Sequence, residues 1–289
     1  MIRKGIILAG GHGTRMSPLT KAVNKQLLPI YDKPLIYYPL SVLMLAGIKE
    51  ILIIVNKGQL SQFRKILLDG KRLGIKINYI EQKTPLGLPD AFILGEKFIG
   101  KDNITLILGD NFFYGQSLTK KLKECIKLKN GCKILVHPVK RPELYGVASI
   151  GKKKNILSLK EKPKNSKSNL AVTGLYFFDN KVIELSKSLK PSKRNELEII
   201  DLLNKYRKKK KLKAEFLGRG GAWLDTGSID DFYNTSSFVS ALENRQGLKI
   251  ACLEEIALNY SWIKREEIKE AINFYGNCMY SNYLKKLIK

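Results

Sequence analysis

The chain has 289 residues, of which 44% are hydrophobic and 27% are charged, and its formal net charge is +26. This composition excludes a disordered chain and suits one large or two small globular domains. No apolar run reaches the ~18 residues of a membrane span, and the N-terminus lacks the pattern of a signal peptide, so we expect a cytoplasmic protein that does not contact a membrane.

The positive charge raises the question of nucleic-acid binding. It comes from 42 lysines and 10 arginines spread along the whole sequence, without the interleaved aromatic residues of single-strand binders. The one dense run, 207–211, closes an expected helix, where cations are favourable. We therefore expect no nucleic-acid partner.

The cysteines and histidines do not form a metal or redox motif. Cys125, Cys132, Cys252 and Cys278 lack the spacing of metal ligands, and we expect reduced thiols. The two histidines, His12 and His137, are too few for a histidine metal site. We expect no chemical role for His12.

The first part of the chain alternates between expected strands and helices. Strands are expected at 5–8, 51–55, 75–80 and 104–108, and helices at 34–47, 59–68 and 90–98. This alternation predicts a mostly parallel sheet with helices on both faces. Ligands bind such sheets at the carboxyl ends of the strands, where the loop after the first strand, Gln82 and Asp110 are expected to meet.

The second part has a different pattern. After a helix at 120–129, closely spaced strands at 133–137, 147–150, 156–161 and 172–178 predict a smaller mixed β region. Helices at 182–189 and 196–209 precede a last strand at 214–217. Further helices at 230–244, 263–273 and 279–287 predict a C-terminal helical extension. We expect an α/β domain over 1–228 and the helical extension over 229–289.

The stretch LAGGHGTRMSPLTKAVNKQLLPI, residues 8–30, carries the strongest functional signal. Three glycines, Gly10, Gly11 and Gly13, permit a sharp turn and bring backbone N–H groups close to phosphate oxygens. Thr14 adds a hydroxyl donor, and Arg15 and Lys25 add positive charge. The pattern is neither a dinucleotide fingerprint nor a P-loop. It predicts a phosphate-binding loop, although glycines alone are also typical of a plain turn.

The same stretch resembles a known family. The strings LAGG-x-GTR, PLTK and KQLLPIYDKP are similar to those of the sugar-1-phosphate nucleotidylyltransferases, most closely the glucose-1-phosphate thymidylyltransferases. The resemblance continues over nearly the full length through EKP, AVTGLYFFD, ELEIID, AWLDTG and RQGLKIAC. It implies a Rossmann-like fold with a nucleotide part (about 1–130), a sugar-binding part (about 131–228) and an oligomerisation or regulatory extension.

The resemblance also implies an activity and its partners. The enzymes of this family transfer a thymidylyl group from dTTP to glucose 1-phosphate, giving dTDP-glucose and pyrophosphate for deoxysugar (such as dTDP-rhamnose) synthesis, as homotetramers. Two other functions stay open: a UDP- or CDP-glucose pyrophosphorylase, since a lone methyl group changes binding by only ~1–3 kcal/mol, and a non-catalytic nucleotide-sugar sensor.

The site residues follow from the matching motifs. Arg15 and Lys25 would meet the triphosphate and Lys162 the sugar phosphate, while Asp110 and Asp225 would hold Mg²⁺, which prefers carboxylate oxygens. The nucleotide would also contact Leu8, Gly10, Gly11, Gly13, Thr14, Gln26, Gln82 and Gly87, and the sugar Tyr145, Gly146, Glu161 and Val172. Without the resemblance, Asp110 could equally be a turn former, Lys162 a solvated side chain and Tyr145 a packed aromatic residue. Gln116 and Asn259 replace a histidine and an arginine expected in the family's feedback site, which leaves feedback regulation open.

Overall fold

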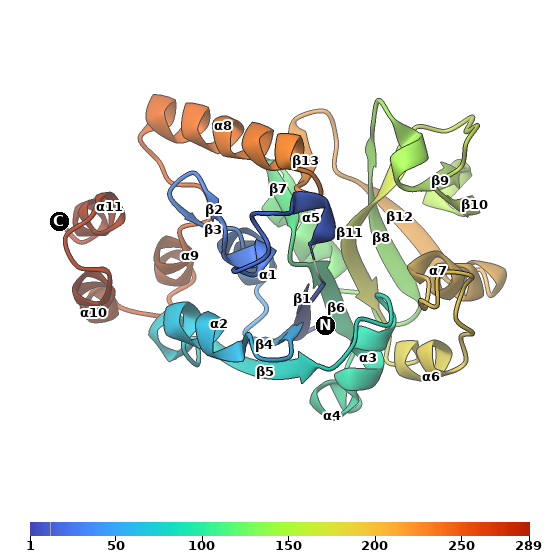
Figure 1. The fold of residues 1–289 in the computed structure, drawn as a ribbon, viewed down its shortest axis with the longest axis horizontal. Helices are drawn as coiled ribbons and strands as arrows, with labels where there is room; N and C mark the ends of the chain where they lie inside the picture. The colour runs from blue at the N-terminus through green and yellow to red at the C-terminus, as the bar shows by residue number, and fades with distance from the viewer. Residues whose placement is uncertain (12) are drawn as a thin grey trace.

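The inner strands of the central sheet are apolar on both faces, so that each of them serves two cores. In the computed structural model, which describes residues 1–11 and 13–289, nine strands form this sheet, and its main path runs β10-β9-β11-β6-β1-β4-β5 (Figure 1). β8 pairs with β11, and β12 pairs with β8, so that both β8 and β12 belong to the same sheet. The strands are β1 (Lys4–Ala9), β4 (Glu50–Asn56), β5 (Lys76–Gln82), β6 (Ile104–Leu108), β8 (Cys132–Pro138), β9 (Gly146–Ile150), β10 (Ile156–Glu161), β11 (Leu170–Phe178) and β12 (Leu212–Phe216).

The predicted parallel half is confirmed. β6, β1, β4 and β5 run parallel, and β11 runs antiparallel to β6, β8 and β9, which begins the smaller mixed region. Neighbouring residues of β1 enter different cores: Ile7 packs with α1 (Tyr37–Leu45) and α5 (Leu118–Cys125), and Ile6 with α3 (Asp90–Leu94) and α7 (Ile199–Lys208). Helices therefore cover both faces, as expected from the sequence. His12, for which we expect no chemical role, lies outside the described residues.

The remaining elements are short or lie in the C-terminal part. The other helices are α2 (Leu60–Leu67), α4 (Glu96–Ile99), α6 (Val182–Lys187), α8 (Ile229–Gln246), α9 (Leu253–Asn259), α10 (Arg265–Tyr275) and α11 (Met279–Leu287). Single 3-10 turns are η1 (Thr14–Met16), η2 (Lys25–Leu27), η3 (Lys71–Leu73), η4 (Pro142–Leu144) and η5 (Lys152–Lys154). Two small antiparallel ribbons pair β2 (Pro29–Ile30) with β3 (Lys33–Pro34) and β7 (Asn111–Gly115) with β13 (Gly221–Asp225).

Several predicted boundaries are wrong for identifiable reasons. The helix predicted from residue 34 begins at Tyr37 because Lys33 and Pro34 form β3. The helix predicted at 90–98 is divided at Gly95 into α3 and α4. The strand at 214–217 is not the last one, because β13 follows it, and the sequence did not predict β7, β13 or α9.

The C-terminal helices share the core of the sheet. Leu253 of α9, Ile268 of α10 and Tyr280 of α11 belong to the same buried cluster as Ile7 and Ile53. In Figure 1, α10 and α11 lie at the opposite end of the molecule from β9 and β10. None of the helices in the described part of the chain is long and apolar enough to cross a membrane.

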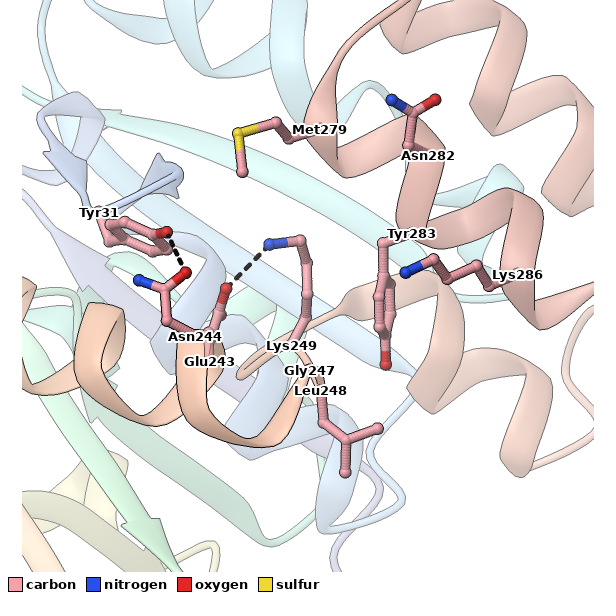
Figure 2. A pocket seen from close by; sticks show the side chains of 10 residues that line it. All are labelled: Tyr31, Glu243, Asn244, Gly247, Leu248, Lys249, Met279, Asn282, Tyr283 and Lys286. Atoms are coloured by element: carbon pink, nitrogen blue, oxygen red, sulfur yellow. Dashed lines mark hydrogen bonds and ion pairs between the residues drawn. The ribbon is translucent and has the colours of Figure 1, made fainter.

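Buried ion pairs fasten the β2–β3 turn to the end of α8. Glu243 accepts hydrogen bonds from Lys33 at 2.9 Å and from Lys249 at 2.8 Å, and Asp32 pairs with both lysines. Figure 2 shows Lys249 and Glu243 joined by a hydrogen bond at the wall of a cavity of about 340 Å³, which residues of α11 line on the other side. The two lysines and the two carboxylates attract one another. The network therefore joins the β2–β3 hairpin, which begins at the end of residues 8–30, to the C-terminal part.

Candidate active site

The β7–β13 ribbon brings two distant aspartates together. Asp110 lies between β6 and β7, after Gly109 and immediately before β7, while Asp225 ends β13 and pairs in register with Asn111. Thr226 secures this pairing, because its backbone N–H and its hydroxyl donate to the carbonyl of Asp110 at 3.1 and 2.8 Å. The two carboxylates therefore meet at the carboxyl end of the sheet.

A buried lysine neutralises the first of these aspartates. Lys25 Nζ lies 2.8 Å from Asp110 Oδ2, and the lysine side chain is only 7% exposed. Asn24 fixes the η2 turn that carries Lys25, because its side chain accepts a hydrogen bond from the Gln26 N–H at 2.8 Å. Lys25 is thus held by its backbone as well as by its ion pair.

The two carboxyl groups have different protonation tendencies. Burial opposes ionisation of Asp110, but the Lys25 charge and hydrogen bonds outweigh it, so the pKa of Asp110 lies below its usual value. Burial and the neighbouring Asp110 charge raise the pKa of Asp225 to about 7. This difference is typical of two carboxylates that share one site and have only one close cation.

Asn111 ties the pair to both sides of the site, and sequence reasoning missed it. Its Nδ2 donates to Asp110 Oδ1 at 3.0 Å, and its Oδ1 accepts from Gly174 N–H at 3.0 Å and from Trp223 Nε1 at 2.6 Å. The G-D-N string after β6 was the available signal. Asn111 keeps Asp110 oriented and connects it to β11 and β13.

A cavity of about 260 Å³ opens beside the aspartates. The predicted residues that line it are Arg15, Asp110, Tyr145, Gly146, Glu161, Lys162, Val172 and Asp225. It is also lined by residues that were not predicted, among them Asn111, Tyr176, Arg194, Glu198 and Trp223. The structure thus brings the predicted metal and sugar residues, together with Arg15 and Lys162, to one cavity.

Two predicted cations of this cavity, Arg15 and Lys162, come from different elements. Arg15 packs against the turn after β13. Its guanidinium lies so close to Gly227 that a Cβ atom added at this glycine would be only 3.0 Å away from it. Lys162 follows β10 in the left-handed region with φ of 41°, which is uncommon for a residue other than glycine. Its N–H donates to the carbonyl of Tyr145 at 3.0 Å. The Tyr145 ring packs edge-on against Trp223 at 5.1 Å, so this side chain both packs and lines the cavity.

The glycine loop faces the end of β5 rather than the cavity. A Cβ atom at Gly10 would lie only 1.7 Å from the amide nitrogen of Gln82, so glycine is required for the buried Gln82 amide to occupy this place. Gly13 is left-handed with φ of 58°, and its carbonyl accepts from Thr20 at 2.8 Å. Thr14 is exposed. The loop residues and Gln82 therefore form one polar wall.

Two further residues predicted to contact the nucleotide, Leu8 and Gln26, lie beside the loop between β6 and β7. The Leu8 carbonyl accepts from Gly109 N–H at 2.9 Å, and the Gln26 side chain approaches the same glycine. Gln26 Oε1 is buried and has no hydrogen-bond partner among the described residues. A buried acceptor of this kind suits a donor group on a ligand.

Gly87 connects the two parts of the domain. It forms a backbone bridge to Leu197, and Leu197 N–H donates to the Leu86 carbonyl at 2.7 Å. Gly87 has φ of 105°, and a Cβ atom there would lie 2.2 Å from the Leu197 carbonyl oxygen. The segment before α7 is thereby joined to the loop after β5. The sequence predicted a helix from residue 196, but α7 begins at Ile199, because Glu198 is extended.

Gln116 and Asn259 line a different cavity. It has a volume of about 420 Å³ and lies between β7, α5 and α9, with Tyr114, Glu255 and Ile256 among its lining residues. The structure therefore separates these two positions from the cavity of Asp110 and Asp225.

The donor set at the aspartates suits a hard divalent cation. Within residues 1–11 and 13–289, no group of three or more His, Cys, Asp or Glu residues has the arrangement of a metal site. The protein would supply two carboxylates, and Mg²⁺ accepts that number together with phosphate oxygens and water. Burial and then the Asp110 charge raise the pKa of Asp225, and a divalent cation held at the two carboxylates would favour its ionised form.

Comparisons with known proteins identify the family of the chain. A family model described as Nucleotidyl transferase matches residues 4–241. A glucose-1-phosphate thymidylyltransferase from Neisseria meningitidis is 50% identical over 286 residues, 99% of each chain. This chain belongs to the glucose-1-phosphate thymidylyltransferase family.

Other members and relatives of this family support the same placement. A glucose-1-phosphate thymidylyltransferase from Mycobacterium tuberculosis is 46% identical over 286 residues, again 99% of each chain. A crystal structure from Bacillus anthracis, provisionally given the same enzyme name and bound to sucrose, has a TM-score of 0.75 at 39% identity, with 81% of this chain and 94% of that chain covered. A UDP-glucose pyrophosphorylase bound to UDP-glucose has a TM-score of 0.74 at 28% identity, with 85% and 100% covered.

Proposed function

We propose that this chain transfers the thymidylyl group of dTTP to α-D-glucose 1-phosphate, giving dTDP-glucose and pyrophosphate. The observation that carries the proposal is the meeting of Arg15, the Lys25–Asp110 pair, Asp225 and Lys162 at one cavity, in a chain 50% identical to a thymidylyltransferase along its whole length. Joining two polyanions needs several cations at one place, because at ~4 Å two unit charges interact by about 4 kcal/mol at an effective dielectric near 20.

The reaction needs positioning and charge rather than a covalent enzyme intermediate. We infer that an oxygen of the sugar phosphate attacks the α-phosphorus of dTTP in line, while the bond to pyrophosphate breaks. Lys162 holds the attacking phosphate, and Arg15 and Lys25 stabilise the charge on the triphosphate. Asp110 and Asp225 would hold Mg²⁺, which would supply further positive charge at the phosphate oxygens.

The nucleotide and sugar contacts are part of the same proposal. The triphosphate lies along Gly10, Gly11, Gly13 and Thr14, and the base lies against Leu8, Gln26, Gln82 and Gly87. Glucose occupies the cavity lined by Tyr145, Gly146, Glu161 and Val172. The polar amide of Gln82 and the unpaired Gln26 Oε1 support a pyrimidine at this place, because a carboxamide can both donate to and accept from a base edge.

One assay tests the activity directly. The protein, Mg²⁺ and glucose 1-phosphate are mixed with dTTP, UTP, dCTP or CTP in turn, and pyrophosphate release is followed. We expect the highest kcat/KM with dTTP and a weaker reaction with UTP, since a hydrophobic contact to one methyl group gives only about 10- to 200-fold discrimination. No product from dTTP where UTP or CTP reacts would contradict the thymidylyl assignment, and no product from any nucleotide would favour a sensor.

The assembly and the location of the enzyme remain predictions. We infer a homotetramer, for which light scattering should give four times the 32.8 kDa chain mass. We also infer that it acts in the cytoplasm, which fractionation of the producing cells would test.

A further inference from the structure

The end of β4 and the turn after it were not predicted to belong to the site, yet their side chains hold the polar wall that the glycine loop and Gln82 form. Asn56 Oδ1 accepts from the Gly11 N–H at 3.0 Å, and Asn56 Nδ2 donates to the Gly11 carbonyl at 2.9 Å. Gln59 Oε1 accepts from Asn24 at 2.6 Å, and Asn24 in turn fixes the Lys25 turn. Asn56 and Gln59 thus support both ends of the loop.

The backbone determines which way the Asn56 amide faces. The Gly11 N–H can only donate and the Gly11 carbonyl can only accept, so only one orientation of the Asn56 amide satisfies both groups. A flipped amide would place an N–H group against an N–H group and an oxygen against an oxygen. The position of Asn56 Oδ1 is therefore fixed by main-chain chemistry.

The fixed oxygen determines the orientation of a second amide. Asn56 and Gln82 are register partners at the ends of the parallel strands β4 and β5, and Gln82 Nε2 donates to Asn56 Oδ1 at 3.0 Å. Because Asn56 Oδ1 can only accept, Gln82 must turn its NH₂ group toward it. Gln82 Oε1 then faces away from Asn56, and it has no partner among the hydrogen bonds of the described residues.

Little space remains for Gln82 to rotate. The side chain is buried at 4% exposure, and its amide nitrogen occupies the place where residue 10 would otherwise carry a Cβ atom, at 1.7 Å. The glycine loop covers the amide on one side and Asn56 holds it on the other. The amide is thereby presented in a single orientation.

We propose that Asn56 is a positioning residue that sets the nucleobase selectivity of the enzyme, by locking the Gln82 amide with its oxygen available to the base. This inference rests on the proposed function, which places the base against Gln82. Thymine and uracil carry an N–H donor at N3, whereas cytosine carries an acceptor at N3 and a donor at its amino group. An amide oxygen that accepts from thymine N3–H meets a lone pair of cytosine in the same pose.

A mobile amide would accommodate both kinds of base. Rotation by half a turn exchanges the oxygen and the NH₂ group, and the rotated amide pairs with the cytosine edge. The Asn56 contact opposes this rotation, because it would place the Gln82 oxygen against the Asn56 oxygen. The Asn56–Gln82 hydrogen bond therefore disfavours cytosine nucleotides. It does not distinguish thymine from uracil, because the thymine methyl group lies elsewhere on the ring.

The test is a competition between dTTP and dCTP with limiting enzyme, Mg²⁺ and glucose 1-phosphate, in which the two nucleotide-sugar products are separated. For Asn56→Ala, we expect the preference for dTTP to fall by about tenfold or more, the scale of an unpaired buried polar group. Asn56→Asp keeps an oxygen toward both Gly11 N–H and Gln82, so we expect the preference to stay within about threefold of wild type while both rates fall. Asn78→Ala is the matched control: Asn78 lies on β5, half buried, away from this network.

The outcomes separate this inference from the proposed function. No product from dTTP with the wild-type enzyme overturns the function and the role of Asn56 together. If the wild type is active and folded Asn56→Ala loses rate with both nucleotides equally, Asn56 only supports the loop and the inference is wrong. Asn56→Thr, which suits a strand end, replaces the alanine variant if that one does not fold. In a Gln82→Ala background we expect no further change in preference from Asn56→Ala, and a further change would also overturn the inference.

Discussion

Replacing Lys25 with methionine removes the charge that faces Asp110 and keeps most of the side-chain volume. The ion pair is 2.8 Å long, with side chains 7% and 24% exposed. Removing one partner of a buried pair costs about 3–5 kcal/mol, and the partial exposure of Asp110 places Lys25→Met near the lower value. For a chain of this size, ~3 kcal/mol corresponds to a fall in Tm of about 6 °C. Turnover should fall by at least ~100-fold, the scale of one electrostatic contact to a transition state.

The loss of stability should depend on pH in a particular direction. In the wild type the pKa of Asp110 in the folded state is depressed. Ionised Asp110 therefore adds to the free energy of unfolding above the usual aspartate pKa, and this stabilisation is lost as the pH falls through the folded-state pKa. Without Lys25, burial and the Asp225 charge remain and raise the pKa of Asp110. The variant is then less stable than the wild type at neutral pH. Its stability recovers as the pH falls, because both carboxyl groups take up protons. The Tm difference between wild type and variant should therefore shrink from pH 8 to pH 4.

Thermal melts across this pH range, in buffer with a chelator, measure the difference. Lys76→Met is a matched control, because Lys76 is an exposed strand lysine for which the described residues provide no ion pair. Adding Mg²⁺ should restore more of the Tm in Lys25→Met than in the wild type, since the variant has two carboxylates without a nearby ammonium group. A Tm difference that is the same at pH 4 and pH 8 would refute the role of the ion pair.

Three further predictions concern the loop, the catalytic charges and the C-terminal part. Gly10→Ala should raise the KM for dTTP at least ~10-fold, because the new Cβ displaces the Gln82 amide. Gly220→Ala, with open space around it and no positive φ, should not, and equal KM values for the two variants would contradict this. Arg15→Ala and Asp225→Ala should each give a folded protein with turnover reduced by at least ~100-fold, and near-normal turnover in either would remove that residue from the mechanism. A chain ending at Gln246 should lose cooperative melting, since α9, α10 and α11 share the core of the sheet, and a sharp wild-type-like melt would show that residues 247–289 are a separate unit.

The parallel half of the sheet could be predicted because its signals are local. Runs such as ITLIL of β6 are continuous and apolar, and each is bounded by turn residues. The β7–β13 ribbon could not be predicted in this way, because its two strands are held together by pairing between segments far apart in the chain. Neither segment alone carries a hydrophobic pattern that would reveal this pairing.

Site residues that belong to a recognised motif could be predicted from the sequence. Residues that act by orienting another residue could not. Asp110 and Asp225 came from motifs, and the structure brings them together through the β7–β13 register. Asn56 and Asn111 act by orienting other groups, and their sequence context is an ordinary strand end. Their roles depend on hydrogen-bond partners that only the folded chain provides.

The bridge between Gly87 and Leu197 is made entirely of main-chain atoms, and this affects how the enzyme can change in evolution. A main-chain contact places no demand on the Leu197 side chain, so substitutions at that end keep the bridge. At Gly87 the positive φ and the 2.2 Å approach of the Leu197 oxygen exclude any side chain. The segment before α7, which contributes Arg194 and Glu198 to the cavity, can therefore vary in sequence without losing its anchor. With the sugar in this cavity, as proposed, new sugar preferences can arise there while position 87 stays fixed.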